Sequence, residues 1–264
     1  MSLGARCIDQ AAARSEAALI GYLPVGFPTV SESIEAGKVL ADEGFDMIEL
    51  GFPYSDPGMD GPVIQRATEQ ALERGVHLTD LLRATEELTN YGITVSSMTY
   101  WNPIMWYGVE QFARDFAQAG GAGLITPDLP PEEGAEWEAA AAEFDLDCIY
   151  LVAPSSPEHR LKLIVEHHRG WVYAASTMGV TGTRLNVDEA ARELVARTRQ
   201  AGAQRVCVGL GVSTGEQAQE IASYADGVIV GSALVRTLFD QPTTFNALRS
   251  LAADLRRGAV RRDA

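Results

Sequence analysis

The stretch IELGFPYSDPGMDGP, residues 48–62, reads as the end of a buried strand, a loop and the first turn of a helix. Residues 47–50 are apolar apart from one carboxylate, and a glycine follows them where the loop opens. Pro62 suits the first turn of a helix, because a backbone N–H is not needed there. The loop carries two further carboxylates, Asp56 and Asp60. A strand–loop–helix unit of this kind is typical of an α/β fold.

Glu49 is the carboxylate within this strand. Side chains alternate across a strand, so Met47 and Glu49 share one face while Ile48 and Leu50 take the other. Burying a charged group is costly unless the group is paired or used. One interpretation is therefore an ion pair between Glu49 and an arginine at the strand end. Three carboxylates, Glu49, Asp56 and Asp60, are expected to converge on this strand end, and with prolines stiffening the loop they favour the other interpretation, a functional site.

The alternation of strand and helix continues along the whole chain. Eight short apolar segments are predicted to be strands: 18–23, 46–51, 93–100, 122–126, 147–153, 171–176, 205–211 and 226–231. Helical patterns lie at 31–43, 79–91, 109–119, 132–143, 157–168, 187–201, 214–223 and 243–257. Strands that are apolar on both faces are typical of a parallel sheet covered by helices. We therefore expect an α/β fold, a (β/α)8 TIM barrel that forms a single domain over residues 1–264, with a short N-terminal extension and a C-terminal helix.

The composition is that of a globular enzyme, with 46% hydrophobic and 22% charged residues among 264. A formal net charge of −15 argues against a nucleic acid or an anionic membrane as the main partner. We see no N-terminal targeting sequence, and no apolar run approaches the roughly 20 residues that cross a bilayer. Cys148 and Cys207 lie in predicted strands, as expected for core thiols in a reducing cytosol. We expect a cytoplasmic protein.

The carboxyl ends of the strands carry the chemistry in a TIM barrel. Besides Glu49, the residues predicted to lie there include Tyr22, Tyr100, Asn102, Asp128, Tyr173 and Thr181. The last strands are followed by glycines that let backbone N–H groups approach a ligand, namely Gly182, Gly209, Gly211 and Gly231. A short extra helix is predicted to begin near Gly231 and Ser232, where free N–H groups and the helix dipole favour an anion. Together these features predict a phosphate site, with tight turns that bind no ligand as the alternative.

Residue types on which other barrel enzymes depend are absent from the predicted strand ends. The two lysines, Lys38 and Lys162, fall in predicted helices, which argues against a Schiff base. The 4 histidines lie in or beside outer helices, which argues against a metal site. No GxGxxG dinucleotide fingerprint follows the first strand. What remains is acid–base chemistry by carboxylates on a phosphorylated substrate, without a cofactor.

Five motifs in a fixed order resemble the tryptophan synthase alpha subunit family. The segment IELGFPYSDPGMDGPVIQ is similar to the family signature, which reads ELG, then PFSDP, then ADGP. The segments MTYWNPI, GVTG, LGVS and VGSALV match further family motifs in order, and the resemblance runs from about Leu19 to Phe239. It implies an enzyme that cleaves indole-3-glycerol phosphate to indole and glyceraldehyde 3-phosphate in the last steps of tryptophan biosynthesis.

The resemblance also implies roles for single residues. Glu49 and Asp60 would be the catalytic pair, and the substrate phosphate would lie at Gly182, Gly211, Gly231 and Ser232. Further substrate contacts would come from Tyr22, Tyr100, Tyr173 and Thr181. This chain would carry no cofactor and no metal. Pyridoxal phosphate would be bound by a partner, the beta subunit, which would form an alpha-beta-beta-alpha heterotetramer with this chain and receive the indole.

The chain departs from the family pattern at Gly58 and Met59, where Leu-Ala is common, and at Phe27, where many members have an acidic residue. Several large apolar residues lie within 101–107, which we expect to be a mouth loop facing the partner. A ribulose-phosphate epimerase or an indole-glycerol-phosphate synthase would share the barrel. The epimerase would need metal-binding histidines at the strand ends, and the synthase would need catalytic lysines; both are missing there. Two alternatives stay open: a free-standing lyase, and a mainly non-catalytic activating partner of the beta subunit.

Overall fold

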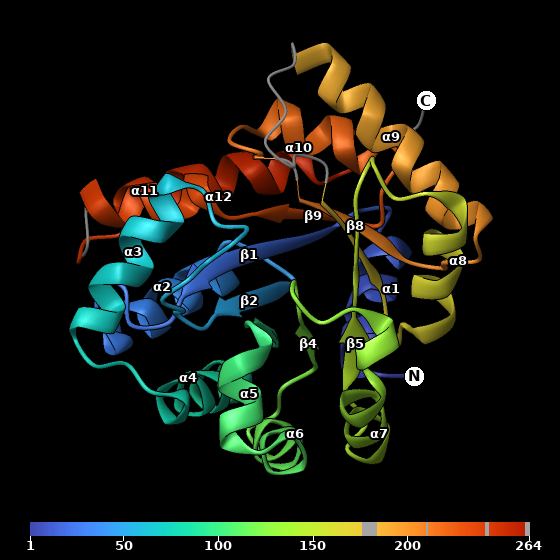
Figure 1. Ribbon diagram of the computed structural model, residues 1–264. Helices are drawn as coiled ribbons and strands as arrows, with labels where there is room; N and C mark the ends of the chain where they lie inside the picture. Colours follow the sequence, from blue (N-terminus) through green and yellow to red (C-terminus); the bar gives the residue numbers. More distant parts are fainter. Residues whose placement is uncertain (176–183, 210, 241–242, 262–264) are drawn as a thin grey trace.

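A parallel sheet forms the centre of the molecule in the computed structural model, which describes residues 1–175, 184–209, 211–240 and 243–261. The sheet has 9 strands in the order β5-β4-β3-β2-β1-β9-β8-β7-β6, and helices surround it (Figure 1). The strands are β1 (Ala18–Pro24), β2 (Met47–Gly51), β3 (Thr94–Met98), β4 (Gly123–Ile125), β5 (Asp147–Ile149), β6 (Leu151–Val152), β7 (Val172–Ala175), β8 (Val206–Gly209) and β9 (Gly227–Val230).

The two strands at the ends of this order, β5 and β6, are consecutive pieces of one chain segment. Tyr150 separates them: β5 pairs with β4, and β6 pairs with β7. The backbone carbonyl of Tyr150 accepts a hydrogen bond of 3.0 Å from the N–H of Tyr173. The strand predicted over 147–153 is therefore interrupted, and its two parts complete the ring. The predicted (β/α)8 barrel is confirmed, since the ninth strand comes from this interruption.

Most helices lie where the sequence predicted them. They are α2 (Val30–Asp42), α3 (Pro62–Glu73), α4 (Leu78–Tyr91), α6 (Val109–Gln118), α7 (Ala135–Glu143), α8 (Glu158–His167), α9 (Arg184–Gln200), α10 (Gly215–Ala222), α11 (Ser232–Asp240) and α12 (Asn246–Gly258). A 3-10 turn, η1 (Pro131–Glu133), precedes α7. The short extra helix expected near Gly231 is α11, so that prediction is confirmed. Two helices were not predicted, α1 (Leu3–Ala13) and α5 (Trp101–Tyr107).

Helix α1 covers the end of the barrel at which the strands begin. Its buried residues Cys7, Ile8 and Ala11 lie on one face at helical spacing. They pack against Trp171, just before β7, and against inward-facing strand residues, which are Ala18, Ile20, Met47, Ile125, Ile149, Cys207 and Ile229. The Cys7 thiol donates a hydrogen bond of 3.1 Å to the carbonyl of Asp46, the residue before β2. The interior is thus filled from this end, and the free opening lies at the carboxyl ends of the strands.

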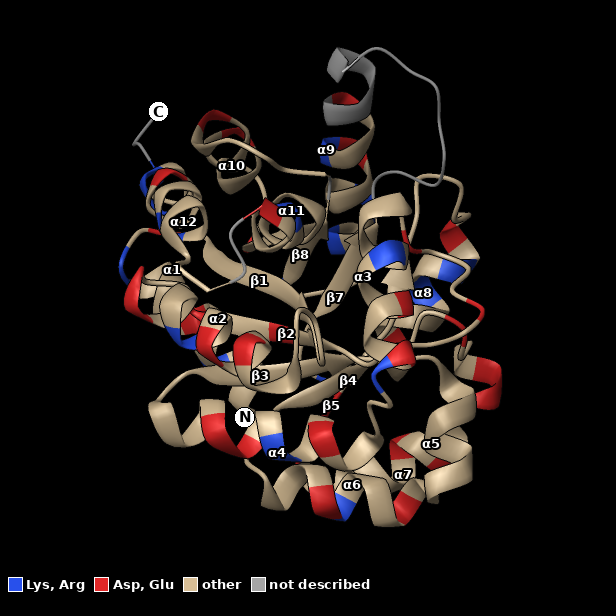
Figure 2. Cartoon of the chain, turned by 90° about the vertical axis from the view of Figure 1, so that its left-hand side faces the viewer, with Lys and Arg blue, Asp and Glu red and all other residues tan. Residues whose placement is uncertain are grey.

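The predicted alternation in β2 is confirmed. Met47 belongs to the interior cluster, whereas Ile48 and Leu50 belong to the larger cluster between sheet and helices. Acidic side chains are spread over the outer helices, in keeping with the formal net charge of −15 (Figure 2). Within the described ranges, no helix is long and apolar enough to cross a membrane.

Candidate active site

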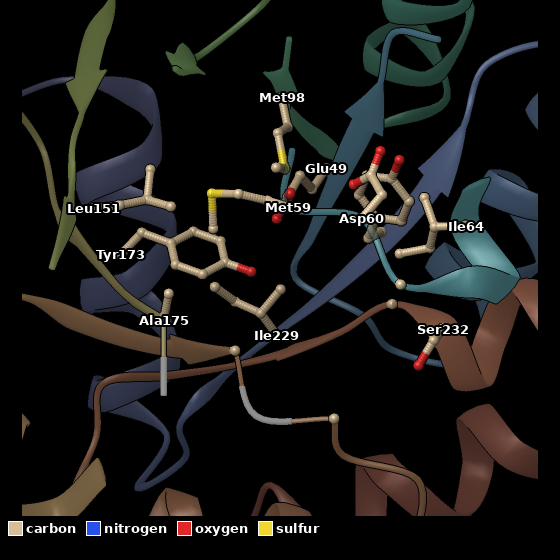
Figure 3. A pocket seen from close by; sticks show the side chains of 15 residues that line it. Glu49, Met59, Asp60, Ile64, Met98, Leu151, Tyr173, Ala175, Ile229 and Ser232 are labelled. Carbon is tan, nitrogen blue, oxygen red and sulfur yellow. The ribbon is translucent and has the colours of Figure 1, made fainter. Parts of the chain in front are cut away.

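A cavity of about 210 Å³ opens at the carboxyl ends of the strands. It is lined by strand ends on several sides, by the loop after β2 and by the start of α11 (Figure 3). Its lining residues are Tyr22, Glu49, Met59, Asp60, Gly61, Ile64, Met98, Leu151, Tyr173, Ala175, Gly209, Gly211, Ile229, Gly231 and Ser232. Most of this lining is apolar, with two carboxyl groups and a few hydroxyl groups at its edge. Such a mixture suits a ligand with a flat apolar part and a polar tail.

Glu49 lies on β2 with its side chain on the inner face, in register with Tyr22 of β1 and Ser96 of β3. The residue is 1% exposed, and neither carboxyl oxygen has a hydrogen-bond partner among the described residues. The ion pair with an arginine, one interpretation of the sequence, is therefore not what the described part of the chain shows. Burial, and secondarily the charge of Asp60, raises the pKa of Glu49 to about 8. Glu49 is thus a neutral acid at pH 7 that can give up its proton.

Asp60 lies on the loop between β2 and α3, next to Gly61, which caps α3. Burial in the cavity raises the pKa of Asp60 to about 6, so its carboxyl is mostly ionised at pH 7. Figure 3 shows Glu49 and Asp60 on the same side of the cavity. The third carboxylate of this segment, Asp56, is exposed and accepts a hydrogen bond of 2.6 Å from the Ser55 hydroxyl. The prediction that all three carboxylates converge is wrong for Asp56.

Tyr22 and Tyr173 line the cavity, as the sequence placed them. Burial raises the pKa of both phenols, with added contributions from Asp60 and Glu49, so both stay protonated and can donate hydrogen bonds. Each ring depends on a glycine for space. A Cβ at Gly51 would lie 2.2 Å from the Tyr22 hydroxyl, and a Cβ at Gly209 would lie 2.4 Å from the Tyr173 hydroxyl. These glycines therefore fix where the phenols lie.

Tyr100 does not line the cavity but contacts the loop that bears Asp60. Its hydroxyl accepts a hydrogen bond of 3.0 Å from the backbone N–H of Met59. The Tyr100 ring stacks on Tyr54 with 4.8 Å between ring centroids. Tyr100, which follows β3, thus holds the loop at Met59, the residue before Asp60.

The opposite side of the cavity has the geometry of an anion site. Gly231 caps α11, and its carbonyl accepts a hydrogen bond of 3.1 Å from the N–H of Val235. Ser232, the first residue of α11, lines the cavity together with Gly231 and Gly211. The described lining contains no lysine and no arginine, so an anion there would be held by backbone N–H groups, a hydroxyl and the helix dipole. Thr181 and Gly182 lie outside the described residues.

Seven lining residues are not among the site residues predicted from the sequence. They are Met59, Gly61, Ile64, Met98, Leu151, Ala175 and Ile229. The strand residues among them follow the alternation that places Glu49 inside, as Met98 shares a face with Ser96, the register partner of Glu49. Every second residue of a strand faces the barrel interior, so counting back by two from each predicted strand end would have identified these strand residues. Met59 lies on a loop, where no such rule applies.

The aromatic segment 101–107 is a helix, α5, and its prediction as a loop is wrong. The Asp128 carboxylate accepts hydrogen bonds of 2.9 and 3.1 Å from the N–H of Trp101, which satisfies the first turn of this helix. Asp128 therefore acts on the backbone of α5, 27 residues away in sequence. Trp106 is 85% exposed and Met105 55% exposed, so both project from the barrel.

The placement of lysines and histidines agrees with the sequence. Lys38 and Lys162 lie in α2 and α8. His159 and His167 lie in α8 as well, and the His167 ring is 3.0 Å from the Glu138 carboxylate. Among the described residues there is no group of three or more His, Cys, Asp or Glu side chains able to hold a metal ion. The described lining of the cavity offers carboxyl and hydroxyl groups for chemistry.

Comparisons with known proteins agree in pointing to one family. The family model described as tryptophan synthase alpha chain matches residues 8–257. The tryptophan synthase alpha chain of Leifsonia xyli subsp. xyli is 54% identical over 262 residues, which cover 99% of this chain and 100% of the relative. That of Mycobacterium avium is 56% identical over 248 residues, 94% of this chain and 91% of the relative. The solved structure of Mycobacterium tuberculosis tryptophan synthase in space group F222 superimposes with a TM-score of 0.93 at 53% identity and covers 98% of both chains.

Proposed function

Because the chain belongs to the tryptophan synthase alpha chain family, we propose that the cavity at its strand ends is the active site. The chain is a carbon–carbon lyase of tryptophan biosynthesis, which splits indole-3-glycerol phosphate into indole and glyceraldehyde 3-phosphate. One observation supports the assignment of roles most strongly. Two carboxyl groups share the cavity, and their pKa values are raised to about 8 for Glu49 and about 6 for Asp60. At pH 7 one of them is an acid and the other an anion.

Glu49 is the proton-transfer residue in this proposal. The carbon–carbon bond breaks readily only when carbon three of the indole ring is protonated, and the protonated Glu49 supplies that proton. The resulting Glu49 carboxylate then removes the proton from the glycerol hydroxyl next to the ring. The bond electrons return to the ring as the aldehyde forms. One proton is given and one is taken, so Glu49 ends the cycle protonated.

Asp60 stabilises the charge that appears during this sequence. Protonation of the ring carbon places a positive charge on the indole nitrogen, and an ionised carboxylate that accepts a hydrogen bond from the ring N–H lowers the energy of that state. Asp60 is suited to this role because its pKa of about 6 leaves it ionised while Glu49 is still protonated. The hydrogen bond between Met59 and Tyr100 holds the adjacent backbone near the cavity.

The substrate phosphate would lie at the start of α11, against Gly211, Gly231 and Ser232, with Gly182 as a further expected contact. Neutral donors are enough here, because a helix N-terminus favours an anion even in an acidic protein. Tyr22, Tyr173 and Thr181 are expected to contact the part of the substrate between the phosphate and the ring. Tyr100 is expected to act through the loop.

The partner in this family is the tryptophan synthase beta subunit. We propose an alpha-beta-beta-alpha heterotetramer in which the beta subunit carries pyridoxal phosphate and receives indole directly, while this chain needs no cofactor of its own. Exposed Trp106 and Met105 on α5 supply an apolar contact surface at the barrel mouth. A cytoplasmic location and a single domain over residues 1–264 fit this proposal.

The role of α5 can be tested with Trp106→Ser. This change should weaken beta-subunit binding by at least about tenfold, as expected for a buried interface tryptophan, and should leave the rate of the isolated chain unchanged. Tyr91→Ser is a matched control, because Tyr91 is an aromatic residue 48% exposed at the end of α4, away from the mouth. Equal binding by both variants in sedimentation would show that α5 is not part of the interface.

Release of glyceraldehyde 3-phosphate from indole-3-glycerol phosphate, with and without beta subunit, tests the proposed function. We expect slow release by the chain alone and faster release in the complex, because the partner favours the closed loop that brings Asp60 over the substrate. Full speed without a partner and no complex would favour the free-standing lyase. No release in either condition would favour a non-catalytic activating partner.

A further inference from the structure

The cavity has two chemically different ends. One is polar, with Ser232 and Gly231 at the start of α11, and Figure 3 shows Ser232 on the side away from Leu151 and Tyr173. The other is apolar and is formed by Met59, Met98, Leu151, Tyr173 and Ile229. If the phosphate of the substrate lies at the polar end, its indole ring lies in the apolar compartment. This step rests on the proposed function.

Met59 differs from the other members of the apolar compartment in where it comes from. Met98, Leu151, Tyr173 and Ile229 lie on strands and are fixed by the sheet. Met59 lies on the loop after β2 and is 37% exposed. Figure 3 shows its side chain extending across the cavity from the loop toward the side that carries Tyr173 and Leu151. The loop therefore contributes one large apolar wall to a compartment whose other described apolar walls lie on strands.

The Met59 backbone is held, while its side chain is free to adapt. Its N–H donates the hydrogen bond of 3.0 Å to Tyr100, which itself stacks on Tyr54. On both sides the loop has space: no atom lies within 4 Å of the position that a Cβ would take at Gly58 or Gly61. Methionine has an unbranched, flexible side chain that adjusts to an irregular neighbour, including the face or edge of an aromatic ring. A fixed backbone with an adaptable side chain is suited to covering a flat ring.

We propose that Met59 is a specificity-determining residue, which closes the indole compartment on the loop side and sets the size of ring substituent that the enzyme accepts. A methyl group on the ring would meet the Met59 side chain at the ring position that faces the loop. A single methyl or methylene group in an apolar compartment changes relative kcat/KM by about tenfold or more. Shortening Met59 to alanine opens the compartment on the loop side, because the other apolar residues described in this compartment lie on the sheet.

The reverse reaction provides a direct test. Indole carbon three forms a bond to the aldehyde carbon of glyceraldehyde 3-phosphate and loses its proton, and the aldehyde oxygen gains one, so nothing else is consumed. Indole and its 4-, 5-, 6- and 7-methyl derivatives would be compared as substrates for the wild type, Met59→Ala and Met59→Leu. Leu3→Ala is the control, because Leu3 is 40% exposed on α1, at the other end of the barrel, and does not line the cavity.

For Met59→Ala we expect kcat/KM relative to unsubstituted indole to rise at least about tenfold for at least one methylindole. Met59→Leu, of similar volume, and Leu3→Ala should keep the wild-type ratios. Ratios for Met59→Ala that stay below a tenfold change at every ring position would overturn the inference, as would an equal loss of activity with all five indoles. Failure of the wild type to condense even unsubstituted indole would instead contradict the proposed function.

Discussion

Replacing Glu49 by glutamine should change how the stability of the protein depends on pH. The carboxyl group of Glu49 is 1% exposed, and its pKa rises from an ordinary 4.5 to about 8 in the folded protein. Between these two values the folded state holds a proton that the unfolded state has released. The free energy of unfolding therefore falls as pH rises through this range. At about 1.4 kcal/mol for each pKa unit, the loss amounts to about 5 kcal/mol.

Glutamine matches the shape of the protonated acid but never ionises, so Glu49→Gln escapes this loss. We expect both proteins to have nearly equal free energies of unfolding at pH 4.5, where the acid is neutral in the folded state and only half ionised in the unfolded state. At pH 8 to 9 the variant should be more stable by up to about 5 kcal/mol. Other titrating groups, such as Asp147 with a pKa raised to about 7, affect both proteins alike and cancel in the difference.

The assay is urea unfolding of both proteins at several pH values between 4.5 and 9, followed by circular dichroism. The difference between the two free energies of unfolding is plotted against pH. A difference that does not change with pH would mean that Glu49 ionises normally, contrary to the expected loss of stability. A variant that becomes less stable than the wild type as pH rises would show that the Glu49 carboxylate is stabilised by a partner.

Further predictions concern the rest of the site. Activity should be highest between about pH 6 and 8, since it needs ionised Asp60 and protonated Glu49, and a kcat/KM profile that is flat from pH 5 to 9 would contradict this assignment. Asp60→Asn should lower kcat by roughly 10²-fold, less than loss of Glu49, and an Asp60→Ala variant with full activity would remove Asp60 from the mechanism. Ser232→Asp should raise KM at least about tenfold by repelling the phosphate, with an unchanged melting temperature, whereas an unchanged KM would place the phosphate elsewhere. Tyr100→Phe should raise KM several-fold, because the Met59 N–H loses a hydrogen bond worth about 1 kcal/mol; an unchanged KM would show that this bond does not hold the loop.

The barrel could be predicted from the sequence because its strands are apolar on both faces and alternate with amphipathic helices. The interruption at Tyr150 could not, since it depends on which neighbour each half of the segment pairs with. Helix α5 was mistaken for a loop because its aromatic and proline residues are typical of loops and interfaces. Its first turn is satisfied by Asp128, and a contact over 27 residues is not visible in local sequence. Helix α1 has a clear buried face. What this face packs against, the interior residues at the end of the barrel where the strands begin, is known only once the barrel is formed.

Some features of the candidate site could likewise be predicted from the sequence, and others could not. Glu49 and its inward direction follow from the period of a strand, and the extra helix at Ser232 follows from the glycine before it. The convergence of Asp60 with Glu49, and the departure of Asp56 from them, depend on how the loop folds back over the strand ends. The pKa values of the two carboxyl groups depend on burial, which requires the packed structure. For the same reason the direction of the Met59 side chain could be seen only in three dimensions.

In the proposed mechanism Glu49 transfers the proton that breaks the carbon–carbon bond. The most direct test of this role is the release of glyceraldehyde 3-phosphate from indole-3-glycerol phosphate by Glu49→Gln, measured together with binding of glycerol 3-phosphate to the same preparation. We expect a rate at least about 10³-fold below the wild type with phosphate binding unchanged, because the transferable proton is lost while the anion site is intact. A rate within tenfold of the wild type would contradict this role of Glu49.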